Sequence, residues 1–489
     1  SVSSTRKTKS NTKSRDTTRV SKSKQKKSCI DNEDNEIKVY LRIRPFSSSE
    51  TNESNIISIQ DDKIVSVKPP IESLAHKAGD YQEHRFTFNR IFDPNSSQNE
   101  VFDNAIFPEL KNIINGFNDD DDDDDDIDES SKNNLFVTYG CSGTGKSYTI
   151  HGDSSTSSPG MVDFILSDVF SKIESYKSSF DEIDENDRLN HVIFLSYVEI
   201  YNEKIYDLLS SNTSRNTSKN DNTTRTPLKL QYDKNMKPVL DAKERTAKDL
   251  KHAKEIIRIG NLARQCASTA VNHVSSRSHA LLTIKILSMP LGLPKKQLLK
   301  NPEKYLKVKK LAIVDMAGNE RTKKSKVSGS QMAVTSKINT SLMVFRNCIE
   351  VLKSNQHSTS SSKNSIQNVV PFRESKLTIL LKEYLTGQGK TSMIVCASPC
   401  GSVYDETINS LKFSSIAKEV RSVPIPSTPK QIRDKNNEVK QEIQNLRKEL
   451  FDIQNQYCIL ESSIRKEYAD DIKLQFNTLL QSESTLELH

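Results

Sequence analysis

The stretch LFVTYGCSGTGKSYTIHG, residues 135–152, combines residue types that suit phosphate binding. An apolar run leads into three glycines within six residues, followed at once by Lys146 and Ser147. Glycine lets backbone N–H groups approach a phosphate, the lysine reaches the β- and γ-phosphates, and the serine hydroxyl holds Mg²⁺. The spacing G-x-x-x-x-G-K-S over residues 140–147 therefore predicts a nucleotide site. A chance glycine-rich turn is the alternative, which the flanking strand and helix patterns disfavour.

Two later stretches have the composition of sensors for a bound γ-phosphate. NHVSSRSHA, residues 272–280, places clustered hydroxyls beside an arginine. DMAGNER, residues 315–321, follows a strand directly, so its aspartate can hold Mg²⁺ through water and its glycine N–H can reach the γ-phosphate. Each stretch alone could be a turn or a helix cap. The three together, in this order, indicate a nucleotide-driven machine.

Alternating strand and helix patterns surround these stretches. Residues 191–209 begin as a buried strand and then become polar and amphipathic. The other expected strands span residues 37–46, 86–93, 281–287, 310–318 and 393–399, and the expected helices span residues 97–115, 248–266, 335–354 and 374–386. Strands that alternate with helices predict an α/β fold with a central sheet flanked by helices.

Charge is distributed in blocks along the 489 residues. The net charge is +7, but residues 1–28 carry +9 and residues 119–129 carry −10, which leaves +8 for the remainder. A basic body suggests an acidic partner, either nucleic acid or an acidic protein surface. No apolar run of about 18 residues predicts a membrane span. Seven scattered cysteines without a C-x-x-C pair suit a reducing cytosol or nucleus and no metal cluster.

Low-complexity segments divide the chain. Residues 1–35 form a basic, Ser/Thr-rich arm that we expect to be disordered; nuclear import, electrostatic attachment and no separate role all stay open for it. The acidic run is expected in a surface insert at residues 118–134, where like charges keep the chain extended. Polar loops are expected at residues 210–226 and 355–369.

The C-terminal part has a heptad pattern. Three prolines interrupt the chain between residues 423 and 431, and apolar residues then recur at alternating steps of four and three within residues 432–489. This spacing predicts a coiled coil and self-association. A single amphipathic helix that packs back on the body is the alternative.

The three phosphate-related stretches, in this order, resemble the kinesin motor domain. The resemblance covers residues 36–422. It includes the segments IRPF (43–46), YVEIYNEKIYDLL (197–209), VPFRESKLTILLKEYL (370–385) and SLKFSSIAKEV (410–420). It implies a P-loop NTPase motor domain with a central mixed β-sheet flanked by helices, followed by a neck linker at residues 423–431. It also implies ATP and Mg²⁺ as cofactors, and ATP hydrolysis stimulated by microtubules.

The resemblance assigns roles to individual residues. Arg277 and Glu320 would form a salt bridge between the two switches, Gly318 would sense the γ-phosphate, and Ser275, with a water relay to Glu320, would position the attacking water. The residues implied around ATP are Arg42, Arg44, Pro45 and Tyr148, which would frame the adenine, and Gly140, Cys141, Ser142, Gly143, Thr144, Gly145, Lys146 and Ser147. The residues implied near Mg²⁺ are Ser147, Ser276 and, through water, Asp315.

Microtubules are the partner that the resemblance implies, and their acidic surface would match the basic body. The candidate contacts follow the second switch: Lys323, Lys324, Lys326, Lys337, Arg346, Arg373, Lys376 and Lys382. We expect a homodimer or larger assembly through the coiled coil, and neither a membrane nor a nucleic-acid partner. The expected location is the cytoplasm, on the cytoskeleton and the mitotic spindle, with the nucleus left open by the basic arm.

Three segments, residues 288–310, 338–356 and 385–399, most resemble the kinesin-6 group. That group implies cross-linking and sliding of microtubules at the spindle midzone in mitosis and cytokinesis. The motor lies ahead of the coiled coil and is followed by a segment that resembles a neck linker, and both features imply plus-end-directed movement along microtubules. Two alternatives stay open: a nucleotide-gated cross-linker that hardly moves, and a motor of another kinesin group. The chain departs from the family pattern at Met316 and Asn319, where Leu and Ser are usual.

Overall fold

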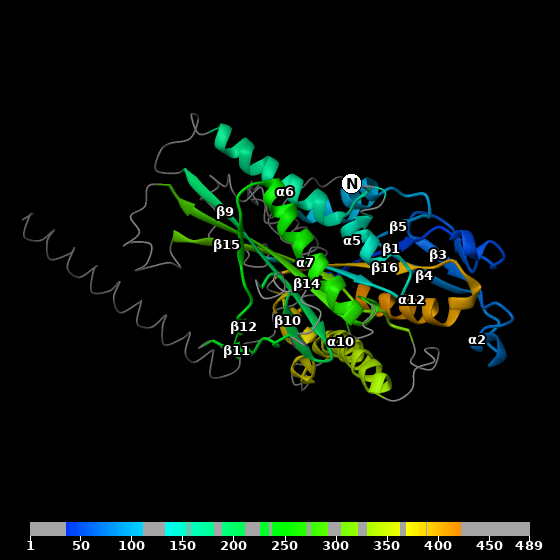
Figure 1. Ribbon diagram of the computed structural model, residues 1–489. Coiled ribbons are helices and arrows are strands. Elements are labelled where there is room, and N and C mark those ends of the chain that lie inside the picture. Colours follow the sequence, from blue (N-terminus) through cyan, green and yellow to red (C-terminus); the bar gives the residue numbers. More distant parts are fainter. Residues whose placement is uncertain are drawn as a thin grey trace, which may run out of the picture. The chain divides into compact units, whose positions relative to one another are not determined.

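A computed structural model describes most of the chain between residues 36 and 421. The described ranges are 36–110, 133–153, 156, 158–179, 188–210, 225–233, 237–270, 275–291, 305–320, 330–361, 368–387 and 389–421. The arm predicted at residues 1–35, the neck linker at 423–431 and the coiled coil at 432–489 lie outside these ranges. The described residues form an α/β domain in which helices flank a central mixed sheet (Figure 1).

The sheet brings the three phosphate-related stretches to one edge. Within the described residues it has nine strands in the order β10-β9-β14-β15-β6-β16-β1-β5, with β13 also paired to β9. The strands are β1 (Lys38–Ile43), β5 (Arg90–Phe92), β6 (Asn133–Tyr139), β9 (Leu189–Tyr201), β10 (Lys204–Asp207), β13 (Arg245–Ala247), β14 (His279–Pro290), β15 (Lys307–Asp315) and β16 (Lys390–Ala397). Because β6 and β15 are parallel neighbours, the segments that follow them emerge side by side. Because β14 is antiparallel to β15, its first residues lie beside the end of β15.

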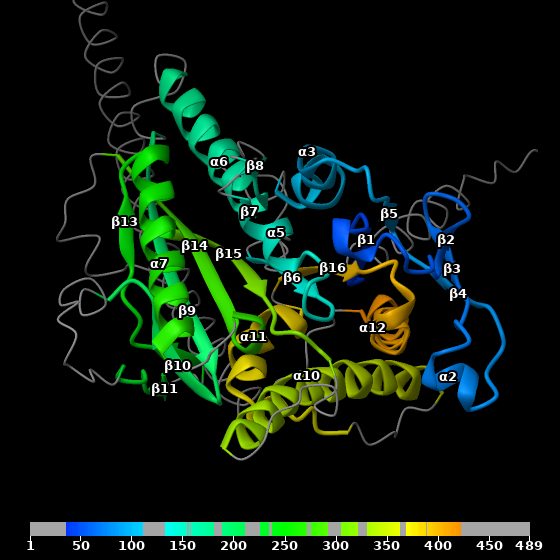
Figure 2. The ribbon, with the colours of Figure 1, turned by 45° about the vertical axis from the view of Figure 1, so that its right-hand side comes forward.

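Helices cover both faces of the sheet (Figure 2). The helices are α3 (Gln98–Val101, continued by a π-helical turn over Phe102–Ile106), α5 (Lys146–His151), α6 (Met161–Ser178), α7 (Leu250–Ala270), α10 (Ser330–Ser361), α11 (Lys376–Leu385) and α12 (Tyr404–Lys418). Alternate residues of β6 contribute to two buried clusters: Phe136 to the cluster with α6 and α7, and Leu135 and Val137 to the cluster with α10, α11 and α12. The sheet is therefore buried on both faces, which explains the continuous apolar runs Leu135–Val137 of β6 and Leu311–Val314 of β15.

Smaller elements decorate this core. A three-stranded sheet contains β2 (Ile57–Ile59), β3 (Ile64–Val67) and β4 (His84–Thr87), and α2 (Leu74–Lys77) lies between β3 and β4. Two short pairs are β7 (Gly152–Asp153) with β8 (Ser158–Pro159), and β11 (Leu230–Tyr232) with β12 (Pro238–Leu240). Short 3-10 helices span Ser48–Glu50, Ser275–Arg277, Phe372–Glu374 and Gly401–Val403.

Two predicted strand segments are more complex than expected. Residues 86–93 were expected to form one strand, but β4 pairs with β3 in the small sheet while β5 pairs with β1 in the large one. Asn89 holds the turn between them, because its backbone N–H and its side-chain oxygen both bond to Val39. The polar part of residues 191–209 is a hairpin, in which Asn202 and Glu203 adopt φ of 54° and 57° between β9 and β10.

Two predicted loop boundaries were wrong. The acidic insert was expected to reach residue 134, but β6 begins at Asn133, where the chain pairs with Lys310 of β15. The side-chain amide of Asn134 also donates to the carbonyl of Glu109 (2.8 Å). The polar loop at residues 355–369 was expected to start directly after the helix, but α10 continues to Ser361.

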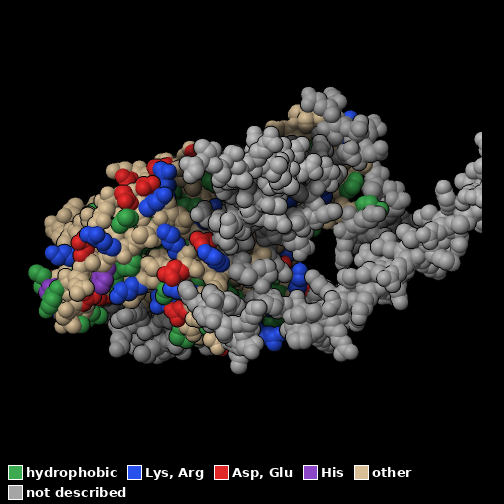
Figure 3. All heavy atoms as spheres, turned by 180° about the vertical axis from the view of Figure 1, so that it is seen from behind, with side chains coloured by type: hydrophobic (Ala, Val, Ile, Leu, Met, Phe, Trp, Pro, Cys, Tyr) green, Lys and Arg blue, Asp and Glu red, His purple; other side chains and the backbone are tan. Residues whose placement is uncertain are grey.

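The surface shows how the charges of the body are arranged. On the face seen in Figure 3, acidic and basic side chains are interspersed over the described surface. The basic excess of the body therefore does not gather into one patch on that described surface. Among the described residues, no helix has both the length and the apolar character needed to cross a membrane.

Candidate nucleotide site

The loop after β6 has the backbone that phosphate binding requires. Its glycines, Gly140, Gly143 and Gly145, adopt φ of 148°, 76° and 97°, in the region that L side chains rarely enter. A Cβ on Gly140 would lie 2.3 Å from the carbonyl oxygen of Cys396, so only glycine fits there. The side-chain oxygen of Thr144 donates to the carbonyl of Cys141 (2.8 Å) and closes the loop on itself. The predicted loop is thus a preformed cradle.

Lys146 and Ser147 begin α5 at the mouth of this cradle. The Lys146 side chain is 6% exposed, and its ammonium donates to the carbonyl oxygens of Gly140 (3.0 Å) and Cys141 (2.8 Å). A buried cation held only by loop carbonyls is available to a phosphate that enters the loop. Burial raises the pKa of the Cys141 thiol to about 11, so this cysteine is a poor nucleophile at neutral pH.

Asp315, at the end of β15, joins the loop to α7. Its Oδ2 accepts hydrogen bonds from the Ser147 hydroxyl (2.7 Å) and from Nη1 of Arg264 (2.8 Å). Burial opposes ionisation of this carboxyl, yet the Arg264 guanidinium and the hydrogen bonds hold the pKa of Asp315 below its ordinary value. Asp315 is therefore a buried carboxylate fixed beside the serine of the phosphate loop.

The donor set around Asp315 fits a magnesium ion. Its second oxygen, Oδ1, is buried and has no hydrogen-bond partner. A buried carboxylate oxygen without a partner is costly, and a water molecule of a Mg²⁺ shell would satisfy it. Together with the neighbouring hydroxyl of Ser147, Asp315 supplies the hard oxygen ligands that Mg²⁺ prefers.

The two sensor stretches meet in front of the loop. The backbone N–H of Gly318 donates to the carbonyl of Ser276 (2.8 Å), which links the second stretch to the first. A Cβ on Gly318 would lie 2.1 Å from Oε2 of Glu320 and 2.4 Å from the hydroxyl of Ser142, so any larger residue would have to displace these two side chains. The Ser275 side chain lies outside the described residues, although its backbone forms part of the Ser275–Arg277 turn.

One predicted contact between the sensor stretches is not formed. The salt bridge expected between Arg277 and Glu320 is absent from the ion pairs of the described side chains. Glu320 instead accepts hydrogen bonds from the backbone N–H (3.0 Å) and the hydroxyl (2.6 Å) of Ser142. The second stretch folds back on the phosphate loop, which directs this carboxylate to Ser142 rather than to Arg277.

His279 connects the site to α10. It is 2% exposed; its Nδ1 accepts from the backbone N–H of Ala317 (3.1 Å), and its Nε2 lies 2.8 Å from the hydroxyl of Ser341 on α10. Burial, and then the nearby Arg264, lower the pKa of His279 to about 3. The imidazole is therefore neutral, and accepting at Nδ1 requires its proton to be on Nε2.

The sequence patterns predicted no role for Arg264 or His279, although both residues carry signals that could have revealed one. On the amphipathic α7, Ala253, Ile256 and Ile257 are buried, and Arg264 continues the same face at helical spacing. A charge on an apolar face needs a partner. His279 is the last polar residue of the first sensor stretch and opens a buried strand.

The adenine end is more open. Tyr148 is 43% exposed, Pro45 is exposed, and Arg44 is tied to Glu50 by two contacts of 2.7 and 2.5 Å. Arg42, which was predicted to frame the base, is instead buried. Its Nη1 donates to the side chains of Gln98 (2.6 Å) and Thr149 (2.9 Å), and its guanidinium lies 5.2 Å from the centre of the Tyr148 ring. Arg42 thus packs against the Tyr148 ring and is held in place by Gln98 and Thr149.

The predicted microtubule contacts are only partly described. Lys323, Lys324 and Lys326 lie outside the described residues, and Lys337 is placed on α10 without its side chain. Arg373 and Lys382 are exposed and Lys376 is half-buried, at or next to α11.

Arg346 does not fit the role predicted for it. It is half-buried, its guanidinium lies 5.1 Å from the centre of the Phe413 ring, and its Nη2 donates to the carbonyl of Asn409 (3.3 Å). It therefore packs α10 against α12.

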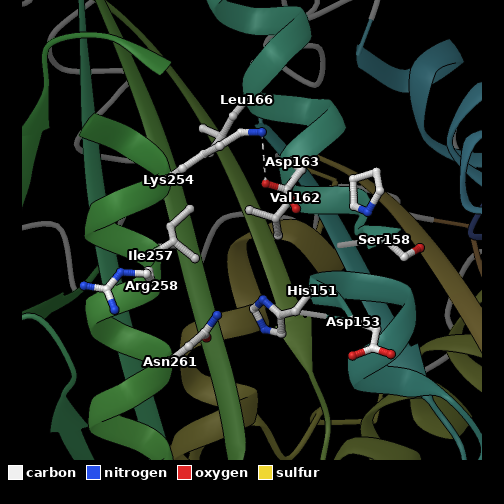
Figure 4. A pocket seen from close by; sticks show the side chains of 11 residues that line it. His151, Asp153, Ser158, Val162, Asp163, Leu166, Lys254, Ile257, Arg258 and Asn261 are labelled. Atoms are coloured by element: carbon white, nitrogen blue, oxygen red, sulfur yellow. Dashed lines mark ion pairs between the residues drawn. The ribbon is translucent and has the colours of Figure 1, made fainter. Parts of the chain in front are cut away.

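A cavity of about 380 Å³ lies at the C-terminal end of α5, between α6 and α7 (Figure 4). His151 and Asn261 line it, and both contact the hydroxyl of Tyr197, at 3.3 and 2.9 Å. At its rim, Lys254 of α7 forms an ion pair with Asp163 of α6 (3.3 Å). This cavity separates the end of α5 from α7, the helix that carries Arg264.

Known proteins resemble this chain over most of its described residues. Residues 42–420 match the family model of the kinesin motor domain. The chain is 29% identical over 438 residues to Kinesin-like protein KIF23 of Mus musculus, covering 78% of this chain and 43% of that protein. It is 34% identical over 341 residues to Kinesin-like protein KIP3 of Saccharomyces cerevisiae, covering 70% and 36%. A solved structure titled "kinesin 6" superposes with a TM-score of 0.58 at 28% identity, covering 78% of this chain and 98% of that one. The chain thus spans less than half the length of these two curated relatives.

Proposed function

The chain belongs to the kinesin family, whose motor domain is a microtubule-stimulated ATPase, and we propose that residues 140–147 bind the phosphates of ATP with Mg²⁺ for this reaction. The observation that carries the proposal is the meeting of the phosphate loop and the two sensor stretches at one edge of the sheet. There, Ser147 bonds to Asp315 and Gly318 bonds to Ser276.

Each residue of the site has a task that its contacts suit. The Lys146 ammonium would exchange its two loop carbonyls for the β- and γ-phosphates. Ser147 and Ser276, with Asp315 through water, would hold Mg²⁺, which when bound neutralises charge on the phosphates. Gly318 would sense the γ-phosphate with the N–H that now bonds to Ser276. Catalysis would then depend on positioning and charge stabilisation rather than on a strong base.

Glu320 would take part in catalysis only after its hydrogen bonds to Ser142 are broken. In the structure, both of its oxygens are engaged by that residue. We propose that a nucleotide in the loop competes for Ser142 and releases Glu320 towards Arg277, where it would join Ser275 in positioning the attacking water. The predicted switch salt bridge is therefore proposed for the nucleotide-bound state.

The cellular role proposed is plus-end-directed movement along microtubules, or sliding of them, in the spindle midzone and cytokinesis. The similarity to KIF23 and to the structure titled "kinesin 6" supports it. So does the position of the predicted neck linker and coiled coil after the motor domain, which also supports a homodimer. Similarity to KIP3 at a comparable identity supports the alternative, a motor of another kinesin group.

A gliding assay tests movement and its direction together. The chain is fixed to glass, and polarity-marked microtubules are added with ATP. Filaments that move with their minus ends leading would support a plus-end-directed motor. Plus ends leading would contradict the proposed direction. Filaments that bind in ATP without moving would instead support a nucleotide-gated cross-linker.

A further inference from the structure

Asn319 lies between the γ-phosphate sensor Gly318 and the carboxylate Glu320, and its side chain points out of the site. Its backbone N–H faces the carbonyl of Gly140 in the phosphate loop (3.4 Å). Its side-chain Nδ2 donates to the hydroxyl of Ser410 on α12 (2.8 Å). One residue thus contacts both the phosphate loop and α12.

Ser410 is built to receive this contact. It is 2% exposed, and its hydroxyl donates to the carbonyl of Glu406 in the preceding turn (2.9 Å). Since its proton is used there, the oxygen is an acceptor for the amide of Asn319. A serine at position 319 would lack the side-chain length to reach this oxygen from the same backbone, so the contact depends on the amide that departs from the family pattern.

α12 connects the site to the end of the motor domain. Its Phe413 ring lies 4.8 Å from the ring of Tyr139, which directly precedes the phosphate loop, and 5.9 Å from the ring of Phe345 on α10. The helix ends at Lys418, and the carbonyl of Val420 then accepts from the backbone N–H of Ile37 (3.0 Å). A shift of α12 would therefore act on the point where the chain leaves the domain.

We propose that Asn319 is a positioning residue that transmits the nucleotide state from the γ-phosphate sensor to α12. This inference rests on the proposed function. A loop that senses the γ-phosphate changes its order when the phosphate arrives or leaves. Asn319 lies in that loop, and its hydrogen bond to Ser410 couples a movement of the loop to a movement of α12.

Two serines of α12 provide a matched test. Ser414 is 1% exposed, and its hydroxyl donates to the carbonyl of Leu411 in the same helix (2.6 Å). Ser410→Ala and Ser414→Ala therefore each remove one buried hydroxyl that bonds to the backbone of α12, but only the first removes the partner of Asn319. Asn319→Ser breaks the same contact from the other side.

The readout is hydrogen–deuterium exchange of the full chain, in ADP and in a non-hydrolysable ATP analogue. Peptides that cover residues 404–421 should exchange at different rates in the two states. This difference should shrink about fivefold or more in Ser410→Ala and Asn319→Ser, the size of a typical coupling between two sites. It should persist in Ser414→Ala, and the double variant Asn319→Ser/Ser410→Ala should show no further loss.

The outcomes separate this inference from the proposed function. A chain that binds neither nucleotide would contradict the proposed function. A chain that binds both, but shows equal exchange at residues 404–421, would overturn the role of Asn319. So would equal losses in Ser410→Ala and Ser414→Ala, because they would reflect packing of α12 alone. Binding of both nucleotides with a loss specific to Ser410→Ala and Asn319→Ser would support the inference.

Discussion

The two ends of the proposed nucleotide site are built differently. At the phosphate end, Lys146, Arg264, His279 and Asp315 are each less than 7% exposed and bonded within the protein. At the adenine end, Tyr148 is 43% exposed, and the buried guanidinium of Arg42 packs against its ring. The phosphate end is thus part of the core, whereas the adenine end is a surface.

This difference predicts how each end responds to change. A buried polar group without its partner costs far more than an exposed one, because water cannot replace the lost contact. Substitutions at the phosphate end should therefore alter stability as well as chemistry. Substitutions at the adenine end should alter mainly affinity for the nucleotide.

Arg264→Ala should have the largest effect. It would leave the buried Asp315 carboxylate without its cation, and breaking a buried pair costs about 3–5 kcal/mol of unfolding free energy. Urea unfolding would measure the change. The control is Arg258→Ala on the same helix, whose pair with Glu255 is exposed and should contribute nothing measurable. Equal stability of the two variants would mean that Arg264 and Asp315 are not paired in solution.

Lys146→Ala should have the second-largest effect, on the rate of ATP hydrolysis. The loss of a preorganised donor to the phosphates should lower the turnover number about 100- to 1000-fold. Steady-state ATPase assays, with and without microtubules, would measure it. Lys254→Ala, which removes an exposed ammonium from the rim of the cavity, should retain full turnover. If Lys146→Ala kept a turnover number within tenfold of the parent protein, Lys146 would only hold the carbonyls of Gly140 and Cys141 and would not stabilise the phosphates.

The sequence predicted the backbone of the glycine-rich loop because its signals are local. The glycines of residues 140–147 and the strands before them follow from spacing and periodicity, and the structure places them as expected. Contacts that join distant segments were not predictable in this way. Glu320 bonds to Ser142 across 178 positions of sequence, and Asn319 reaches Ser410 across 91. Nothing in either segment alone specifies the other.

The adenine end illustrates a second limit. The resemblance placed Arg42, Arg44, Pro45 and Tyr148 around the base, but it did not separate contact from support. The composition of β1 could have done so, because Arg42 falls within a strand whose other residues from Val39 to Ile43 are apolar or aromatic, and all of these residues are buried. A charged residue in such a strand must bond within the protein, as Arg42 does with Gln98 and Thr149.

The unfolding free energy measured over a range of pH would test how deeply the phosphate end is buried compared with the adenine end. Burial lowers the pKa of His279 to about 3 and that of His151 to about 4, below the unfolded value of about 6.5. The unfolded chain therefore binds more protons between these values, so stability is full above about pH 6.5 and falls as the pH drops towards 4. Urea unfolding at pH 7.5 and 5.5 should differ by about 1 kcal/mol for each histidine.

His279→Asn gives the control for this series. Asparagine keeps an acceptor in the place of Nδ1 for the N–H of Ala317 but does not titrate. In this variant, the difference in unfolding free energy between pH 7.5 and 5.5 should be smaller by about 1 kcal/mol, the contribution of one histidine. Carboxylates such as Asp315, whose pKa is held below its ordinary value, do not titrate in this window. An unchanged dependence would show that His279 is not the neutral, buried group that its contacts indicate.

Tyr148→Ala should have the smallest effect and is the sharpest test of the open end. The side chain is 43% exposed and packs on Arg42, so removing it deletes an aromatic face without leaving a buried charge unpaired. Stacking of this kind contributes about 1 kcal/mol, which corresponds to about a fivefold weaker affinity for ATP. Titration with a fluorescent ATP analogue would measure the affinity, and urea unfolding should show little change. A large loss of stability would instead mean that Tyr148 holds Arg42 in place, and the adenine end would then belong to the core as much as the phosphate end does.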